Sequence, residues 1–260
     1  METQLALMKT ITLSEMKAVQ LMNRVDQKYL THLGALPQLL GLIAPHYYVQ
    51  RIEGDAVALY RTLYFDTLEL EMYTQHHNRK CHRQKLRIRT YRSTQTTFFE
   101  LKDKDNKGKT SKSRISLPVS SFYTALEHPQ VADFVCQHTP YTPLRLTKQL
   151  ENSFSRITLV DIGMTERVTI DFSINFRNHA TGLSTELPNL VIIEVKHQLG
   201  APVSAIEKAL QQLRIPPRRM SKYCIGTALT NPSAKSNRFK DKIRYINKIM
   251  AHQATQTPSA

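Results

Sequence analysis

The sequence has few cysteines and no long apolar run. Its three cysteines, Cys81, Cys136 and Cys224, lie far apart without a C-x-x-C pair, which excludes a disulfide framework and a cysteine zinc cluster. The N-terminus lacks the apolar segment of a signal peptide, and the longest apolar runs, such as residues 190–193, are too short to cross a bilayer. We therefore expect a cytoplasmic chain with no transmembrane segment of its own.

Acidic residues are scarce relative to basic ones. The 260 residues include 36 lysines and arginines but only 21 aspartates and glutamates, which gives a formal net charge of +15. This surplus indicates an anionic partner, either nucleic acid, an acidic membrane surface or a phosphate-rich molecule. The ten histidines include no H-x-x-x-H pair beside a third ligand, so we expect them at the surface or in packing roles.

The pattern of elements predicts one strand-rich domain over residues 1–230, followed by a basic C-terminal helix and flexible tail over 231–260. Helices are expected at 14–22, 120–138 and 202–213. Strands are expected at 24–30, 82–91, 97–104, 113–119, 143–149, 154–161, 166–176 and 190–197. Antiparallel-looking strands with helices at the ends predict an α+β fold dominated by a sheet or barrel.

Charged side chains alternate with apolar ones along five strands. Residues two apart share a face of a strand, which groups Arg83 with Lys85, Arg87 and Arg89, Glu100 with Lys102, Lys112 with Arg114, Arg167 with Asp171, and Glu194 with Lys196. For any single strand a solvated charged face is the ordinary interpretation. Like charges in a row repel unless an anion neutralises them, so the repetition favours a barrel whose inward face binds an anion.

Nine short motifs occur in order over residues 14–227. They are R-x-D-x-K-Y at 24–29, Y-x-T-x-Y-F-D-T at 60–67, Y-x-x-H at 73–76, R-x-K-x-R-x-R-x-Y at 83–91, E-x-K at 100–102, S-R-I-T-L at 155–159, E-R-V-T-I-D at 166–171, E-V-K at 194–196 and S-K-Y at 221–223. With this set the chain resembles the vacuolar transporter chaperone (VTC) domain, the polyphosphate polymerase branch of the CYTH-like triphosphate tunnel metalloenzyme superfamily.

The resemblance implies an antiparallel eight-stranded β-barrel tunnel with helices outside and at its ends. It also implies ATP and polyphosphate as substrates, Mn²⁺ or Mg²⁺ as cofactor, and transfer of the ATP γ-phosphoryl group to a growing chain. By position, the implied phosphate contacts are Lys28, Arg87, Arg89, Lys102, Arg156, Arg167 and Lys222, with further contacts at Lys85, Lys112, Arg114 and Lys196. Glu194 matches the metal-binding glutamate, and Glu100 is either a second metal ligand or a salt-bridge partner of the lumen arginines.

One departure concerns the superfamily's N-terminal E-x-E-x-K motif, which here has Arg24 and Asp26 in place of its two acids. The loss of an acid lowers the expected metal binding and favours a more basic, polymerase-like lumen.

Several functions remain open at this point. On the same tunnel, a metal-dependent triphosphate or polyphosphate hydrolase would use water in place of the chain end, and a non-catalytic module would only bind polyphosphate or nucleotide. Specific nucleic-acid binding is disfavoured because the cations alternate within strands and the aromatics are not interleaved as stacking platforms. A membrane-associated partner protein, at the inner face of a membrane, also remains open.

Overall fold

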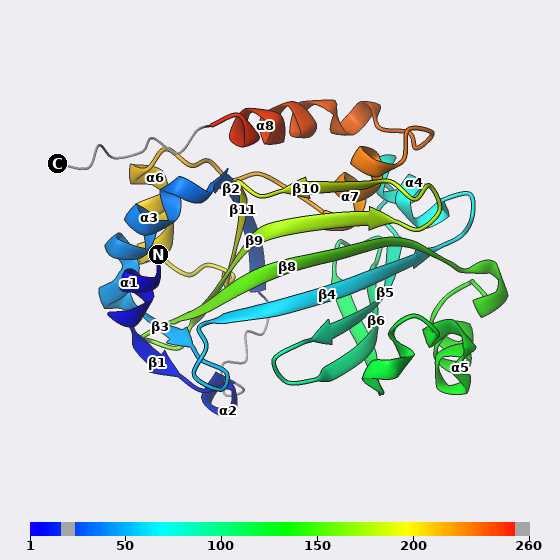
Figure 1. Cartoon of the computed structure of the whole chain (residues 1–260), viewed down its shortest axis with the longest axis horizontal. Coiled ribbons are helices and arrows are strands. Elements are labelled where there is room, and N and C mark those ends of the chain that lie inside the picture. The colour runs from blue at the N-terminus through cyan, green and yellow to red at the C-terminus, as the bar shows by residue number, and fades with distance from the viewer. Residues whose placement is uncertain (17–23, 253–260) are drawn as a thin grey trace.

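One curved sheet dominates the fold (Figure 1). The computed structural model describes residues 1–16 and 24–252, and its longest path of paired strands is antiparallel throughout. In order across the sheet these strands are β2 (Arg24–His32), β11 (Leu190–Gln198), β9 (Glu166–Asn178), β8 (Thr147–Asp161), β4 (Val57–Asp66), β5 (Arg83–Tyr91), β6 (Thr96–Lys104) and β7 (Thr110–Leu117). The expected α+β fold with a dominant antiparallel sheet is confirmed.

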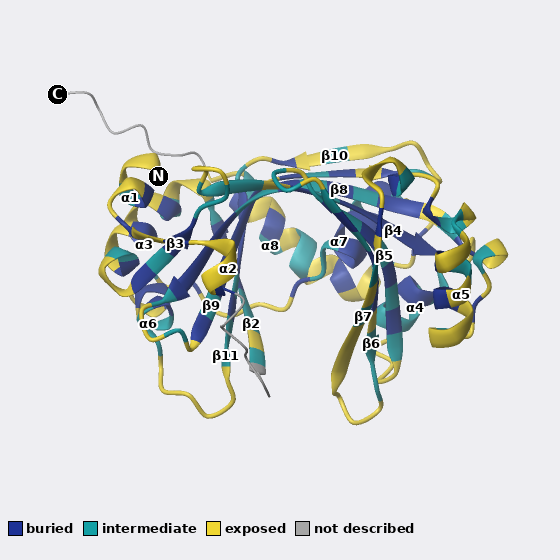
Figure 2. Ribbon diagram, turned by 90° about the horizontal axis from the view of Figure 1, so that it is seen from below, coloured by how far each residue is buried: buried dark blue, intermediate teal, exposed yellow. Residues whose placement is uncertain are grey.

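The sheet bends into an arch, with β2 and β11 in one wall and β6 and β7 in the other (Figure 2). Within residues 1–16 and 24–252, β2 and β7 are not paired with each other. In these residues the expected antiparallel strands therefore form an open arch and not the closed barrel that was expected. Shorter strands extend it: β3 (Tyr47–Gln50) pairs with β8 and, in parallel, with β1 (Lys9–Ile11), and β10 (Ser184–Leu187) pairs with β9.

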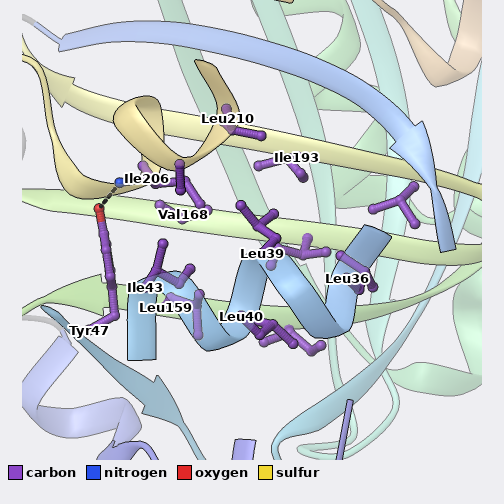
Figure 3. Close-up of a cluster of buried hydrophobic side chains, with 14 of the residues drawn as sticks. Leu36, Leu39, Leu40, Ile43, Tyr47, Leu159, Val168, Ile193, Ile206 and Leu210 are labelled. Carbon is purple, nitrogen blue, oxygen red and sulfur yellow. Dashed lines mark hydrogen bonds between the residues drawn. The ribbon is translucent and has the colours of Figure 1, made fainter. Parts of the chain in front are cut away.

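The convex face of the arch carries the largest apolar cluster. α3 (Leu36–Ile43) and α6 (Ala205–Gln212) cover β8, β9 and β11 there, and α1 (Glu2–Ala6) packs beside α3. Figure 3 shows Leu39 and Ile43 of α3 beside Val168 and Ile193 of the sheet, all of them fully buried. Each such side chain contributes roughly 1.5–3 kcal/mol by leaving water. The outward apolar residues of the alternating strands are thus used to hold helices.

A second cluster covers the other wall. α5 (Pro129–His138) packs Phe134 and Val135 against Leu86, Ile88 and Phe99 of β5 and β6. Pro129 occupies the first turn of α5, where its missing N–H costs no hydrogen bond. The region expected to be helical over 120–138 is accordingly divided into two 3-10 turns followed by α5. Both walls of the arch are therefore backed by apolar layers.

One end of the arch is covered by α7 (Lys222–Thr230) and α8 (Lys240–Met250), which lie at the top of Figure 1. Ile246 and Ile249 of α8 are buried in a cluster with Leu30 of β2 and Ile192 of β11. A Cβ atom added at Gly226 would lie 2.5 Å from a Phe176 side-chain carbon, so a glycine is what lets α7 approach the sheet. The expected basic C-terminal helix therefore has one side packed on the sheet, and residues 253–260 lie outside the described residues.

Two boundaries differ from those expected. The segments 143–149 and 154–161 were predicted as separate strands, but residues 143–145 form a 3-10 turn and β8 runs without interruption from Thr147 to Asp161. The helix predicted at 14–22 is α2 (Leu13–Met16), and residues 17–23 lie outside the described residues. α4 (Glu71–His77) follows β4. Among the helices of the described ranges, none has both the length and the apolar character needed to span a bilayer.

Candidate functional site

The predicted phosphate-contacting cations share the concave face of the arch. Burial alternates at every residue of β5, with the apolar side chains in the outer core and the cations half-buried on the opposite face. Strand pairing places the other cations on this same face, and α7 adds one more from the covered end. The set is Lys28, Lys85, Arg87, Arg89, Lys102, Lys112, Arg114, Arg156, Arg167, Lys196 and Lys222.

Asp171 of β9 organises the cations at the centre of the sheet. Arg156, directly across on β8, donates two hydrogen bonds to its carboxylate, at 2.5 and 2.8 Å. Lys222 of α7 donates to the same carboxylate. Burial alone would raise the pKa of Asp171, but Arg156 and Lys222 outweigh it and hold that pKa at about 2. The carboxylate therefore stays ionised and fixes both cations in place.

Aromatic rings contact these two cations on the concave face. The Arg156 guanidinium lies 4.7 Å from the centroid of the Tyr60 ring, and the Lys222 ammonium lies 4.2 Å from that of Phe154. Cation–π attraction of this kind strengthens when the cation is desolvated. The rings restrict where the charges can move, so the cations are oriented before any ligand arrives.

Glu100 of β6 is an ion-pair partner. Arg87 donates to one carboxylate oxygen at 2.7 Å, and Lys112 pairs with the other oxygen. Burial alone would raise the pKa of Glu100, yet Arg87, Arg89 and Lys112 together lower it to about 2. The side chain is only 1% exposed. Of the two roles expected for Glu100, the structure shows the salt bridge.

Glu194 of β11 lies between two lysines on the opposite wall. Its carboxylate oxygens are 2.7 Å from the Lys28 ammonium and 2.8 Å from the Lys196 ammonium. These lysines hold the pKa of Glu194 well below its usual range against the opposing effect of burial. The side chain is 18% exposed, so it can be reached from the concave side, which the sealed Glu100 cannot.

The oxygen atoms around Glu194 are of the kind that ligate a hard divalent cation. Thr169 pairs across from Glu194 on β9, and its hydroxyl is buried without a hydrogen-bond partner. Asp26 of β2 adds a second carboxylate, paired across from Lys196. Carboxylate and hydroxyl oxygens suit Mg²⁺ and Mn²⁺, which bind through one or two carboxylates and the substrate phosphates. The residues present are therefore compatible with such an ion.

The S-K-Y motif ties α7 to three different strands. Ser221 caps the helix by accepting from the Cys224 N–H, and it also bonds the Lys85 ammonium at 2.9 Å. Lys222 reaches Asp171. The Tyr223 hydroxyl donates to Asp66 at 2.5 Å. Three consecutive side chains thus position the helix and deliver a cation to the site.

Asp66 itself, from the Y-F-D-T segment, is structural. Its carboxylate accepts hydrogen bonds from the backbone N–H groups of Thr67, Met72 and Tyr73. It also accepts one from the Tyr223 hydroxyl. It is fully buried and holds the start of α4 against the end of β4. These four hydrogen bonds give Asp66 a structural role.

Lys102 of β6 shows that the two walls interact electrostatically. Although Lys102 retains contact with solvent, desolvation lowers its pKa to about 8. Lys85 of the same wall and Lys28 of the opposite wall lower it further, while Asp26 and Glu194 of the opposite wall raise it. Charges on β2 and β11 therefore contribute to the pKa of Lys102 from across the arch.

This pKa predicts a pH-dependent affinity for polyanions. A bound phosphate group would raise the pKa of Lys102, so the complex holds more protons than the free protein near pH 8. The affinity for tripolyphosphate should fall severalfold as the pH rises from about 7 to about 9, measured by calorimetry. Lys102→Arg keeps its charge over this range, and its affinity should fall less. Identical pH profiles for the two proteins would contradict the prediction.

Two groups of functional residues were missing from the sequence-based site. Asp26 and Asp171 stand on the cationic faces of their strands, and the alternation already placed Asp171 beside Arg167. Tyr60 and Phe154 lie on the same concave face, but nothing in their motifs distinguishes a ring under a cation from a core aromatic. The alternation in the sequence predicts which cations share one face of the sheet, whereas their pairing with particular acids and rings depends on strand register.

Comparison with known proteins agrees with this geometry. The model of the VTC domain family matches residues 23–231. A solved structure of a candidate adenylate cyclase from Bacillus halodurans is similar with a TM-score of 0.50 and 18% identity, covering 77% of this chain and 96% of its own. A candidate adenylyl cyclase from Hippeastrum, described as having a dominant triphosphatase activity, is similar with a TM-score of 0.50 and 16% identity, covering 82% and 98%. No curated protein matches the sequence.

Proposed function

The chain belongs to the VTC domain family, and on this basis we propose that it is a polyphosphate polymerase. In this proposal it transfers the γ-phosphoryl group of ATP to the end of a polyphosphate chain bound on the concave face. The observation that carries the proposal is the convergence of cations from both walls and from α7 on one surface, where they outnumber the carboxylates that pair with them. Such an excess of positive charge needs an extended, highly charged anion to neutralise it.

The proposed roles follow from side-chain geometry. Arginine presents a flat fork that matches two phosphate oxygens, and lysine provides a compact charge. Arg156, held by Asp171, and Arg87, held by Glu100, are oriented in advance. With Arg89 they would clamp the triphosphate. Positioning and charge stabilisation account for most of the catalysis of phosphoryl transfer.

Other residues would handle the acceptor. Lys222 at the covered end and Lys28 on the opposite wall would orient the γ-phosphate and the incoming chain end. Arg167 and Lys196, which pair across β9 and β11, would hold the phosphates that follow. No side chain has to act as nucleophile, because an oxygen of the terminal phosphate attacks. Each transfer then leaves ADP and lengthens the chain by one phosphate.

A divalent cation has a defined place in this proposal. Glu194 would hold it, with Asp26 and the Thr169 hydroxyl nearby, and when bound it would neutralise charge on the phosphate oxygens. Lys28 and Lys196 pair with the carboxylate of Glu194. Beside a bound ion, both ammonium groups would contact phosphate oxygens.

Hydrolysis is the second candidate, favoured by the triphosphatase activity described for the Hippeastrum protein of similar fold. The two reactions differ only in whether a phosphate chain end or water attacks. Incubation with ATP and Mn²⁺, followed by phosphorus NMR, separates them. Polymerisation produces internal-chain phosphate signals in proportion to ADP, hydrolysis produces free phosphate in proportion to ADP without those signals, and a binding module leaves ATP unchanged.

A matched pair of variants controls for net charge in this experiment. Arg89→Ala removes a cation from the concave face, and Arg244→Ala removes one from the exposed side of α8. Polymer formation should fall at least tenfold in the first and stay near the wild-type rate in the second. Equal losses would count against the concave face as the site. Tighter binding of DNA than of polyphosphate at the same salt concentration would favour a nucleic-acid function.

A further inference from the structure

A group of three potential metal ligands lies outside the concave face. Glu166 of β9 and His197 of β11 are directly paired across the two strands, and both belong to the convex-facing set of residues. Glu207 belongs to the first turn of α6, which packs over these strands. One ligand atom from each of the three lies within 4.8 Å of the others. The cluster therefore bridges the sheet and the helix that covers it.

Two of these side chains have atoms that lack a hydrogen-bond partner. Glu166 is only 3% exposed, and its Oε1 accepts a hydrogen bond from the Tyr47 hydroxyl at 2.5 Å, while its Oε2 is buried with no such partner. The Nδ1 atom of His197 is also buried without a partner. Buried polar atoms are nearly always satisfied, and an exception calls for an unseen water or ion. Here two of the buried atoms without a partner belong to the same group of three residues.

The surrounding hydrogen bonds orient the two carboxylates. Tyr47, which also accepts from the Ile206 N–H (Figure 3), fixes the Oε1 side of Glu166. Glu207 and Ser204 form a capping box in which Oε2 of Glu207 accepts from the Ser204 N–H at 3.0 Å. This leaves Oε1 of Glu207 free of that bond. Such supporting contacts are typical of the residues around a metal ligand.

We propose that Glu166, His197 and Glu207 bind a divalent transition-metal ion of the Zn²⁺ class on the convex side of the sheet. Two carboxylates this close repel each other unless a cation or proton lies between them. An imidazole with two carboxylates suits Zn²⁺ better than Mg²⁺, which prefers oxygen ligands. Tetrahedral Zn²⁺ ligands are roughly 3.4 Å apart, so small side-chain rotations would bring the three into place. Water would complete the coordination.

The position of this site gives it a structural task. Glu166 and His197 immediately adjoin Arg167 and Lys196, whose side chains belong to the concave face. An ion held by both strands and by α6 fixes the backbone from which these two cations project. The ion is thus separate from the cation proposed at Glu194, on the other side of the sheet.

The test measures Zn²⁺ binding to the dialysed full chain without ATP, by calorimetry and thermal unfolding. The wild type should bind one Zn²⁺ at this site and unfold at a higher temperature with it. His197→Ala should weaken that binding at least tenfold, and so should Glu207→Gln. Ser204→Ala also disrupts the cap of α6 but removes no ligand, so it should retain the ion. Co²⁺ in place of Zn²⁺ should give visible absorption bands that His197→Ala loses.

The Glu194→Gln variant distinguishes this outer site from the cation site proposed at Glu194 on the concave face. It should bind Zn²⁺ at the outer site as the wild type does. The proposal is overturned if the wild type binds no Zn²⁺, if His197→Ala binds it as well as the wild type, or if Glu194→Gln alone abolishes binding. The measurement contains no phosphoryl donor, so a failure of the proposed polymerase activity would leave its outcome unchanged.

Discussion

Replacing Glu194 with glutamine should reduce Mn²⁺-dependent phosphoryl transfer by roughly a hundredfold or more while leaving the affinity for polyphosphate equal or higher. The amide cannot supply the charged oxygens that a divalent cation needs, and loss of such an ion removes several kcal/mol of charge stabilisation, where each 1.36 kcal/mol is tenfold in rate. Lys28 and Lys196 would meanwhile lose their partner. Both ammonium groups would then be fully available to phosphate.

A lower transfer rate combined with an equal or higher affinity would distinguish loss of the metal ion from general damage to the fold. Single-turnover transfer from ATP and equilibrium binding of tripolyphosphate should be measured on the same preparation. Glu186→Gln, at an exposed position of β10, removes the same charge and should change neither. Wild-type turnover in Glu194→Gln would remove the metal role from this residue, and a parallel loss of rate and affinity would indicate a general binding defect.

Replacing Asp171 with asparagine should destabilise the ligand-free protein by about 3 kcal/mol, the lower end of the range for breaking a buried ion pair. Two cations whose side chains are 15% and 13% exposed would lose their shared counter-charge. Arg156 and Lys222 both pair with this carboxylate, whose side chain is 4% exposed. Tripolyphosphate should restore more stability to the variant than to the wild type, since its phosphates can replace the missing charge. Urea unfolding with and without tripolyphosphate measures both effects.

The pH dependence of this difference has a defined sign. The pKa of Asp171 is about 2 in the folded protein, below the value of about 3.9 for an unfolded chain. Its contribution is therefore complete above about pH 4 and is lost as the pH falls towards 2, so the wild type and Asp171→Asn should converge in acid. Asp241→Asn breaks an exposed pair with Arg244 and should have no measurable effect. A difference between Asp171→Asn and the wild type that does not depend on pH would argue against the ion pairs as its cause.

The sequence predicts the parts of this fold that depend on local periodicity. β5 shows why: its cations and apolar residues alternate without interruption, and burial alternates with them. β8 shows the limit, because its polar residues around Asn152 and Ser153 resemble a break between two strands. The structure continues through them with a register shift between Ser153 and Ser155, and the buried Asn152 stays in the sheet. Pairing with β4 and β9 overrides the local preference there.

The residues of the outer metal cluster illustrate the same limit for sites. Glu166, His197 and Glu207 have no motif spacing, because two of them meet through strand pairing and the third through helix packing. Their histidine was accordingly expected to serve only packing or solvation. Contacts of this kind depend on register across the sheet, which a single sequence does not reveal.

The outer edge of β7, which pairs only with β6 among the described residues, has a consequence for the behaviour of the protein in solution. A strand at the rim of a sheet exposes unpaired backbone groups on which another molecule can assemble, and charged side chains are a common protection against this. β7 has Lys112 and Arg114 on one face and no acidic residue along its length. Two copies approaching rim to rim would bring these charges together, and their repulsion opposes aggregation through β7.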